Sequence, residues 1–261
     1  MINIGTCVNF LTNTNLLNSD KEPEMSNTHQ PTYRYPTSVT FCITGNVYTT
    51  GFFNSWTGLL FYLKENPSLI NPHFINYHSE NIYEARNYML GGDPSLGKWQ
   101  LPLIEDYDSK YIFFIDSNMV FNPMQVMQII YKMIKFDLDI LSAVCVQNDS
   151  VTTNVLSDDS EEYLIKNGKF EFYKKQELIS LGLKAENNLV EVSNVGLNLI
   201  CIKNELFEKI DYPWFEPELY KNLKGFYSAD HSIIRKFKNI DIKVLCDTSL
   251  IVGRDTTVTI K

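Results

Sequence analysis

The chain has 261 residues, of which 44% are hydrophobic and 21% are charged, a composition typical of a globular protein. Its formal net charge of −8 argues against the phosphate backbone of a nucleic acid as a partner. The sequence shows no signal-peptide pattern and no apolar run of the ~20 residues that a membrane span requires. We therefore expect a protein without a transmembrane segment, located in the cytoplasm.

The five cysteines favour a reducing compartment. None of them has the C-x-x-C spacing of many metal and redox sites, and four lie inside apolar runs that resemble strands. We interpret them as reduced residues, mostly of the core. These four are Cys42, Cys145, Cys201 and Cys246.

The domain is expected to begin after residues 1–37, which are rich in Asn, Thr, Ser and Pro and predict an extended or partly disordered arm. Residues 38–44 form the first apolar run and predict a strand. Apolar residues from Trp56 onward recur at helical spacing until Asn66-Pro67, and a second strand is predicted at 74–77.

The centre of the chain continues this alternation. Residues 81–90 predict a helix, and the uninterrupted apolar run 111–115 predicts a strand buried on both faces, as in a parallel sheet. Asn122 and Pro123 are suited to the start of the next helix. With a further strand at 139–146, the pattern predicts a mostly parallel α/β sheet flanked by helices.

The second half departs from this pattern. Residues 147–188 are expected to be an insertion at the edge of the sheet, with a β-hairpin that turns at Asn167-Gly168. We expect one domain over 38–261, with a nucleotide-binding half at 38–146 and an acceptor half at 189–261. The elements predicted in the acceptor half are strands at 196–202, 242–246 and 250–252 and helices at 203–210 and 228–239.

Polar residues follow the central strand directly, at Asp116, Ser117 and Asn118. Ligands of open α/β sheets bind at the carboxyl ends of the strands, so these residues are candidates for a site. Arg86 lies at the rim of the apolar stripe of helix 81–90, where it requires an anionic partner. A salt bridge to a core aspartate such as Asp116 and a contact to a nucleotide both remain open.

Two further charged positions have simple structural interpretations. Asp230 is in the first turn of its helix, where the helix dipole favours any carboxylate, and His231 beside it suits the surface or a half-buried position. Arg254 precedes Asp255, which suggests a local ion pair of little energetic value.

The order and spacing of these segments resemble the GT-A fold of nucleotide-sugar-dependent glycosyltransferases, over about residues 38–255. The central piece is the apolar strand 111–115 followed by Asp116-Ser117-Asn118, which resembles the strand that ends in D-x-D in that family. The other matching pieces are Thr44-Gly45, Ala85-Arg86-Asn87, and the segments 194–203, 226–234 and 250–254.

The resemblance implies a donor site, an acceptor site and a catalytic base. Asp230 would take the proton of the acceptor hydroxyl as general base, giving inversion at the sugar. The donor site would comprise Thr44, Gly45, Arg86, Asn87, Asp116, Ser117 and Asn118. The acceptor site would comprise Asn194, Gly196, Trp214, Phe215 and His231, with the two aromatic residues stacking on the acceptor sugar.

The sequence departs from the family at two positions that commonly bind a divalent metal there. They hold Asn118, in place of the last aspartate of D-x-D, and Arg254, in place of the histidine of V-G-H. An amide and a cation are poor ligands for Mg²⁺ or Mn²⁺. We therefore predict no cofactor firmly and disfavour both metals; if a metal binds, Asp116 and Asn118 would hold it. Arg254 would instead stabilise the leaving diphosphate.

The function implied is transfer of a hexosyl or pentosyl group from a nucleoside-diphosphate sugar to a glycan or glycoprotein hydroxyl. One alternative is a catalytically inactive sugar- or protein-binding module of the same fold. A sugar nucleotidyltransferase is less favoured because 45–51 lacks a basic residue, and a Rossmann dehydrogenase because no G-x-G-x-x-G follows the first strand. Abundant Asn, Ile, Lys and Tyr hint at an AT-rich genome, such as that of a large virus, where the location would be the host cytoplasm.

Overall fold

The computed structural model describes residues 36–103 and 109–255. The arm expected at 1–37 therefore lies almost wholly outside the described residues. The strands are β1 (Thr37–Thr44), β2 (Ile70–Tyr77), β3 (Tyr111–Asp116), β4 (Met119–Val120), β5 (Ile140–Cys145), β6 (Thr152–Leu156), β7 (Phe172–Lys174), β8 (Leu189–Glu191), β9 (Asn194–Val195), β10 (Leu199–Lys203) and β11 (Val244–Arg254). The helices are α1 (Thr50–Glu65), α2 (Ile82–Met89), α3 (Pro123–Lys135), α4 (Glu161–Asn167), α5 (Lys175–Gly182) and α6 (Ala229–Lys238), with short 3-10 helices η1 (Pro94–Leu96), η2 (Glu186–Asn188) and η3 (Asn204–Lys209).

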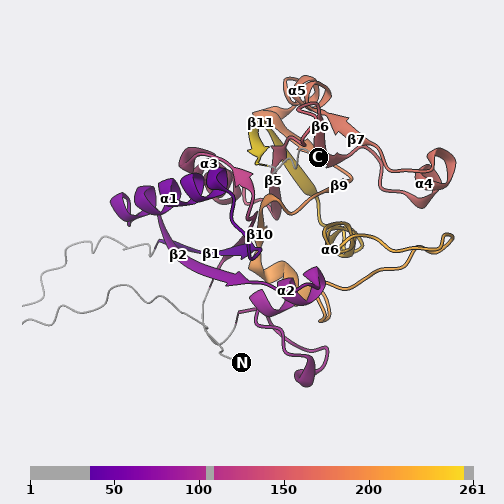
Figure 1. Cartoon of the computed structure of the whole chain (residues 1–261), viewed down its shortest axis with the longest axis horizontal. Coiled ribbons are helices and arrows are strands. Elements are labelled where there is room, and N and C mark those ends of the chain that lie inside the picture. The colour runs from indigo at the N-terminus through magenta and orange to yellow at the C-terminus, as the bar shows by residue number, and fades with distance from the viewer. Residues whose placement is uncertain (1–35, 104–108, 256–261) are drawn as a thin grey trace, which may run out of the picture. The chain divides into compact units, whose positions relative to one another are not determined.

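The main sheet has the order β2-β1-β3-β10-β5-β11-β4, and β8 pairs with β11 (Figure 1). Strand β1 runs parallel to both β2 and β3, and β5 runs parallel to β11. Strand β10 lies antiparallel between β3 and β5. The mostly parallel α/β sheet predicted from the sequence is thus confirmed, with one antiparallel strand in its middle.

The centre of the sheet is buried on both faces, and residues Tyr111–Ile115 of β3 are buried at every position. Ile112 and Phe114 of β3 belong to one hydrophobic cluster, and Phe113 and Ile115 belong to the other. Successive side chains of a strand point to opposite faces, which explains this division. Helices α1 and α3 cover one face, and α2 and α6 contribute to the cluster on the other (Figure 1).

The start of α3 follows the sequence signals closely. Asn122 accepts a hydrogen bond from the Gln125 N–H at 3.0 Å, and the Gln125 side chain accepts from the Asn122 N–H at 3.0 Å, forming a capping box. Pro123 occupies the first helical turn. Ser228 caps α6 by accepting a hydrogen bond from the N–H of His231. Both predicted helix starts are confirmed.

The hairpin predicted at Asn167-Gly168 is wrong. Residues Glu161–Asn167 form helix α4, which Ser160 caps, and Gly168 ends it in the left-handed conformation with φ of 73°. A glycine after asparagine fits a helix C-terminus as well as a hairpin turn, so the dipeptide did not distinguish them. Strands β6 and β7 of the insertion instead form a separate three-stranded sheet with β9, which follows the insertion.

The last two predicted strands form one strand. β11 runs continuously from Val244 to Arg254, and its register against β5 shifts between Asp247 and Ile251. The polar residues Asp247, Thr248 and Ser249 lie at this irregularity, where the sequence analysis had expected a gap between two strands. The strand brings Arg254 to the edge of the sheet, where it pairs with Met119 of β4.

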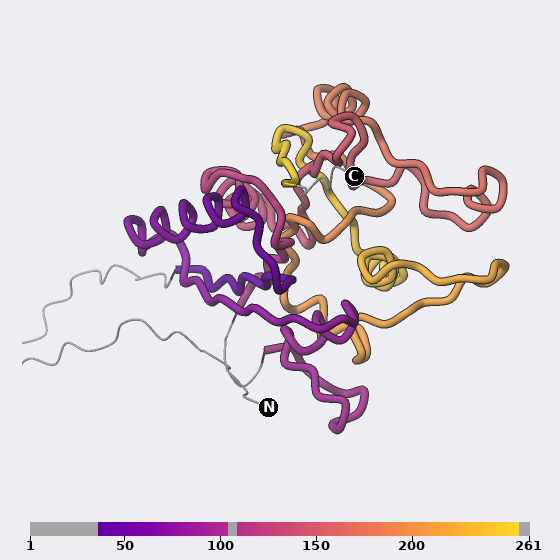
Figure 2. Tube along the Cα trace, viewed as in Figure 1, coloured from indigo at the N-terminus to yellow at the C-terminus, as the bar shows by residue number. Residues whose placement is uncertain are grey.

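Two segments extend from the sheet on the same side of the view in Figure 2: the segment around α4, and the loop before α6. The carboxylate of Glu161 joins them by accepting from the backbone N–H groups of Lys221 and Asn222, at 2.7 and 3.0 Å. Buried carboxylates that accept several N–H bonds are held firmly. The loop before α6 is thus anchored to the insertion.

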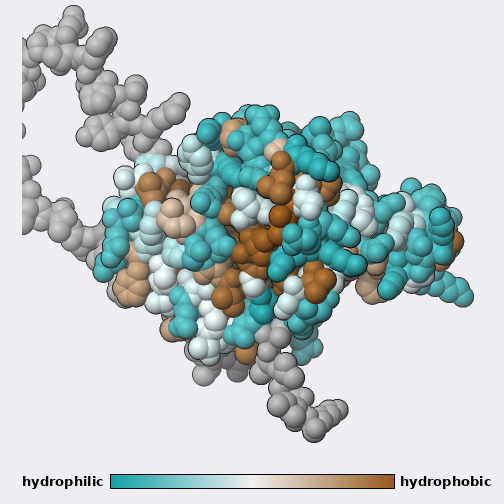
Figure 3. Space-filling view, turned by 90° about the horizontal axis from the view of Figure 1, so that it is seen from above, coloured by the Kyte–Doolittle hydropathy of each residue, from teal (hydrophilic) through white to brown (hydrophobic). Residues whose placement is uncertain are grey.

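The surface is mixed. Exposed aromatic side chains on α1 include Phe53 and Phe61, and Figure 3 shows hydrophobic residues gathered in the middle of the face seen from above, with hydrophilic residues around them.

No helix within 36–103 and 109–255 has the length and apolar character needed to cross a bilayer. The four cysteines of the described chain are free and buried, as expected; Cys7 lies outside it.

Candidate active site

A backbone hydrogen bond links the ends of β1 and β3 and brings together three residues predicted to bind the sugar donor. The N–H of Ser117 donates to the carbonyl of Thr44 at 3.2 Å. Gly45 follows with φ of +137°, and a Cβ there would lie 2.3 Å from Ser117 Oγ. Only glycine tolerates both this backbone conformation and this approach. Thr44, Gly45 and Ser117 therefore form one edge of the candidate site.

Asp116 is held from two sides at the end of β3. Its Oδ2 accepts a hydrogen bond from Asn198 Nδ2 at 2.6 Å and one from Arg254 Nη2 at 3.3 Å. Arg254 belongs to β11, so its guanidinium reaches Asp116 from a strand three positions away in the sheet. The local ion pair with Asp255 considered from the sequence is not formed, because Asp255 accepts instead from the N–H of Gly51.

A second ion pair joins Arg86 of α2 to Asp230 of α6. Arg86 Nη1 donates to Asp230 Oδ1, and the other oxygen, Oδ2, accepts from the N–H of Leu197 at 3.0 Å. The guanidinium carbon of Arg86 lies 5.6 Å from the centre of the Phe215 ring, and the side chain is almost fully buried. The sequence left open a core aspartate and a nucleotide as the partner of Arg86. In the structure the partner is an aspartate, Asp230 rather than Asp116.

The two carboxylates have pKa values shifted in opposite directions. Burial raises the pKa of Asp116, and the nearby Asp230 carboxylate raises it further, against the lowering effects of Arg86, Asn198 and Arg254. Burial also acts to raise the pKa of Asp230, but the charge of Arg86 and the hydrogen bonds from Leu197 and Arg86 hold it below its ordinary value. Opposed shifts in neighbouring carboxyl groups are typical of catalytic sites.

The loop 196–198 connects these two carboxylates. The N–H of Leu197 binds Asp230, while the side chain of the next residue, Asn198, binds Asp116. Asn198 Oδ1 in turn accepts from Asn154 Nδ2 at 3.2 Å, which fixes the orientation of its amide. A Cβ at Gly196 would lie 2.6 Å from Asn198 Oδ1, so glycine permits the close turn.

Sequence reasoning missed Asn198 and Asn154. Asn198 lies within the segment 194–203 that resembles the family, and it is a polar residue in an otherwise apolar run. That contrast was the available signal. Asn154 gave no such signal, because it lies in β6 of the insertion, whose place next to the main sheet depends on the tertiary fold.

Three residues predicted to contact substrates are instead buried structural residues. Trp214 and Phe215 are 0% and 1% exposed, so their rings cannot stack on an acceptor sugar as expected. Trp214 Nε1 donates to the carbonyl of Phe207, and the ring packs in the core. The Asn87 side chain bonds to both backbone polar groups of Phe215, at 2.7 and 3.1 Å, and so supports this loop rather than a nucleotide.

The two other predicted acceptor side chains differ in exposure. Asn194 is fully buried, and its Nδ2 donates to Asp159 Oδ2 and to the carbonyl of His231, both at 3.3 Å. The His231 ring is half-buried against Phe170, with centroids 5.9 Å apart. Burial lowers the pKa of His231 more than Asp230 and Asp159 raise it, so the ring favours its neutral form.

Several polar atoms around the two ion pairs lack a hydrogen-bond partner within the described chain. They are Arg86 Nε, Arg254 Nε and Asn118 Oδ1, each of them buried. Buried polar atoms in proteins are nearly always paired, so such a group concentrated at one sheet edge is unusual. Two guanidinium edges with free donors indicate a site suited to an anion.

The donor set at this edge does not fit a divalent metal ion. Within the described ranges, no three His, Cys, Asp or Glu side chains are grouped closely enough to hold one. Asp116 is the carboxylate at the predicted metal position, and Arg254 Nη2 lies 3.3 Å from its Oδ2. A cation beside this anionic ligand would repel Mg²⁺ or Mn²⁺. Asn118 offers one amide oxygen, which does not offset this repulsion.

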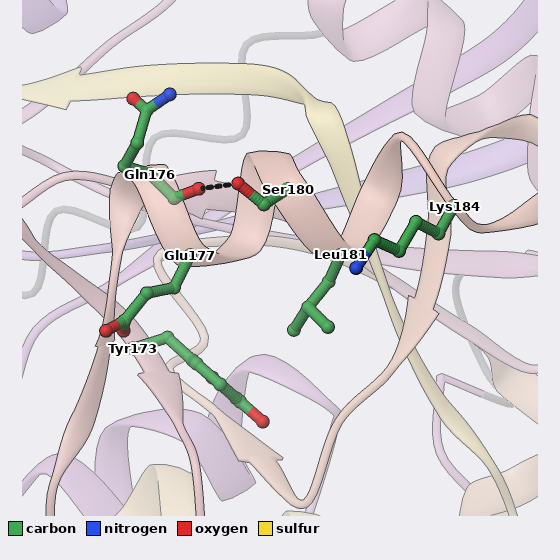
Figure 4. Close-up of a pocket in the computed structure, with 6 residues that line it drawn as sticks. All are labelled: Tyr173, Gln176, Glu177, Ser180, Leu181 and Lys184. Atoms are coloured by element: carbon green, nitrogen blue, oxygen red, sulfur yellow. Dashed lines mark hydrogen bonds between the residues drawn. The ribbon is translucent and has the colours of Figure 1, made fainter.

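A surface pocket elsewhere contains none of these residues. It has a volume of about 460 Å³ and lies along α5, as Figure 4 shows, lined by Tyr173, Gln176, Glu177, Ser180, Leu181 and Lys184. Ser180 Oγ donates to the carbonyl of Gln176 within the same helix. The candidate site is therefore defined by its polar residues rather than by this pocket.

Comparison with solved structures identifies proteins of similar fold. GalNAc-T7, crystallised with UDP, GalNAc and Mn²⁺, aligns with 87% of this chain at a TM-score of 0.52 and 10% identity; this chain spans 45% of it. A197 from STIV aligns with 86% of this chain over 98% of its own length, at a TM-score of 0.45 and 14% identity. Glucosyl-3-phosphoglycerate synthase from Mycobacterium tuberculosis, in complex with Mg²⁺ and uridine diphosphate, aligns with 86% of this chain over 73% of its length, at a TM-score of 0.41 and 10% identity.

At these identities the likeness concerns the fold alone. The mixed α/β arrangement with a mostly parallel central sheet is the one expected of a GT-A fold, and it is similar to that of a known glycosyltransferase. No protein-family model matches the sequence, and no curated protein matches it. The activity is therefore inferred from the site.

Proposed function

We propose that this chain is a glycosyltransferase that moves a sugar from a nucleoside-diphosphate sugar to an acceptor hydroxyl, on a glycan or glycoprotein, with inversion at the sugar and without a metal ion. The observation that carries the proposal is the pair of arginine–aspartate contacts at the carboxyl edge of the sheet. These contacts place two cations and two carboxylates, with opposed pKa shifts, where ligands of open α/β sheets bind.

The donor would lie along the edge formed by β1 and β3. Thr44, Gly45 and Ser117 would line the nucleotide and ribose, and Asp116 would accept hydrogen bonds from sugar or ribose hydroxyls. The fork of Arg254 suits bidentate contact with phosphate oxygens, and its Nε is buried without a partner in the described chain. This arrangement supports a role for Arg254 in neutralising the diphosphate as it leaves.

The chemical step would use Asp230 as general base. The acceptor oxygen attacks the anomeric carbon and loses its proton to Asp230, while the bond from that carbon to the diphosphate oxygen breaks and its electron pair leaves with the nucleotide. Arg86 holds the pKa of Asp230 low, which weakens it as a base. A movement of the Arg86 guanidinium toward the charge growing on the diphosphate would strengthen Asp230 as the proton is transferred.

The acceptor site needs residues other than those expected, because Trp214 and Phe215 are core residues. Gly196 and His231 remain candidates through their proximity to Asp230: a Cβ at Gly196 would lie 3.3 Å from Asp230 Oδ2, and His231 follows Asp230 in α6. The loop before α6, which Glu161 anchors, would border the same site through Tyr227, whose carbonyl accepts from Tyr83 of α2.

A screen of nucleotide sugars by thermal unfolding tests the proposal. UDP and UDP-GalNAc are suitable first probes, because a protein of similar fold was crystallised with UDP and GalNAc. Each probe would be measured with EDTA and, separately, with Mn²⁺, and hydrolysis of the sugar from the nucleotide would be followed by mass spectrometry. A ligand specific to the native state raises the melting temperature. We expect stabilisation and slow hydrolysis in EDTA.

The outcomes separate the alternatives. Stabilisation by a nucleotide sugar without any hydrolysis or transfer would favour the inactive binding module. Release of pyrophosphate from a nucleoside triphosphate and a sugar phosphate would favour the nucleotidyltransferase. No stabilisation by any nucleotide sugar, at concentrations that saturate known transferases, would overturn the proposal.

A further inference from the structure

The end of β11 is tied to two other elements through a single residue, Asp255. Its carboxylate Oδ2 accepts a hydrogen bond from the N–H of Gly51 at 3.0 Å, in the first turn of α1. Its own N–H donates to the carbonyl of Asn118 at 2.8 Å. We refer to these two hydrogen bonds as the Asp255 clasp. It connects the end of β11 to α1 and to the turn that follows β3.

The position of the clasp matters because Asp255 is adjacent to Arg254. Pairing of β11 with β4 ends at Arg254 and Met119, so the clasp is the next backbone attachment along the strand. Without it, Arg254 would be held by its pairing with Met119 alone, and its long side chain would have more orientations available. The side chain is about a quarter exposed and makes one hydrogen bond with Asp116.

Gly51 allows the Asp255 carboxylate to approach the first turn of α1 closely. A Cβ there would lie 2.9 Å from Asp255 Oδ2 and 2.7 Å from Val120 Cγ2, so only glycine allows the approach without displacement. Two other N–H groups of this turn are already satisfied by Thr49, through its hydroxyl at Phe52 and its carbonyl at Phe53. The Asp255 carboxylate satisfies the N–H of Gly51 and interacts favourably with the helix dipole.

We propose that Asp255 is a positioning residue, which fastens the end of β11 to α1 and to Asn118 and thereby keeps the guanidinium of Arg254 directed at Asp116 and the diphosphate. The part that concerns the diphosphate rests on the proposed function. Asp255 itself contacts no substrate in this scheme and acts entirely through Arg254. Its removal therefore has the effect of a partial loss of Arg254, and it has no effect of its own once Arg254 is gone.

A double-mutant cycle tests this coupling, with UDP binding in EDTA measured by calorimetry. Asp255→Ala should weaken UDP binding by a smaller factor than Arg254→Gln does, and it should add less than twofold in the Arg254→Gln background. Asp255→Asn retains an oxygen for the N–H of Gly51 and should recover most of the affinity. An equal loss from Asp255→Ala with and without Arg254 would overturn the proposal.

Gly51→Ala provides an independent perturbation that should not unfold the protein. Alanine favours the helix more than glycine does, yet its methyl group would displace the Asp255 carboxylate. We expect weaker UDP binding with only a small fall in melting temperature, because Val120 Cγ2, which the methyl group would approach to 2.7 Å, belongs to a partly exposed side chain that can move aside. Asp241→Asn is the matched control, since it removes one exposed carboxylate at a positive φ that asparagine tolerates, and it should leave UDP affinity unchanged. Unchanged affinity in Gly51→Ala would contradict the clasp.

A measurement without nucleotide separates failure of this inference from failure of the proposed function. The ¹H–¹⁵N signal of Arg254 Nε, assigned by its loss in Arg254→Lys, reports exchange of that proton with water. Exchange should become at least tenfold faster in Asp255→Ala and in Gly51→Ala, but not in Asp241→Asn. If the wild-type protein binds no UDP, the proposed function fails while this exchange still decides the role of Asp255. Equal exchange in wild type and Asp255→Ala overturns the inference.

Discussion

Replacing Arg254 by glutamine should weaken binding of a nucleoside diphosphate far more than it destabilises the fold. Charge-assisted hydrogen bonds contribute about 1.5–3 kcal/mol each, so losing one phosphate contact corresponds to about a 10- to 150-fold rise in Kd. The fold should lose about 1 kcal/mol or less, because the Arg254 and Asp116 side chains are 28% and 25% exposed and water screens their contact.

Arg254→Lys refines this prediction. Lysine preserves the charge but loses the planar fork, so its UDP affinity should fall between those of the wild type and Arg254→Gln. Calorimetry with UDP in EDTA gives Kd, and urea unfolding gives the free energy of unfolding for the same three proteins. If Arg254→Gln binds UDP as tightly as the wild type, Arg254 does not face the diphosphate and the reasoning is refuted.

Three further predictions concern the base, the core and the loop between the carboxylates. Asp230→Asn should lower kcat by at least 100-fold with donor affinity nearly unchanged, and equal losses in both would indicate a structural role. The folded pKa of Asp230 lies below its ordinary value of 3.8, so its ionised form stabilises the protein above that pH. This stability is lost as the pH falls through the folded pKa. Acid unfolding of Asp230→Asn should therefore be less steep, and an unchanged steepness would contradict the assigned shift. Trp214→Ala should cost about 3–5 kcal/mol of stability in urea unfolding because the ring is fully buried, whereas a stable variant with a raised acceptor KM would restore its predicted stacking role. Gly196→Ala should reduce kcat with little change in UDP affinity, since the added methyl would press on Asn198 Oδ1 and lie near Asp230, and a fully active variant would show that the loop is not restrained there.

Elements fixed by local signals were predictable from the sequence. The run 111–115 is apolar at every position and became the central strand, while Asn122 and Pro123 began α3 as their chemistry favours. The same logic placed Asp116 at the carboxyl end of the strand. The hydrogen bond between Arg254 and Asp116 was not predicted, because nothing local in the sequence relates β11 to β3.

Features that depend on tertiary packing were not predictable. Asn167-Gly168 is compatible with a hairpin and with a helix end, and in the structure Gly168 ends helix α4 in the left-handed conformation. Trp214 and Phe215 have aromatic side chains suited to both a sugar site and a core, and only their neighbours decide. The antiparallel place of β10 between β3 and β5 likewise requires knowledge of the whole sheet.

The most direct test of the account is sugar transfer or donor hydrolysis by the purified protein in excess EDTA. The account assigns neutralisation of the leaving diphosphate to Arg254, 3.3 Å from Asp116, so turnover should continue in EDTA and should fall sharply in Arg254→Gln. Complete loss of turnover in EDTA, restored by Mn²⁺ and insensitive to Arg254→Gln, would contradict it.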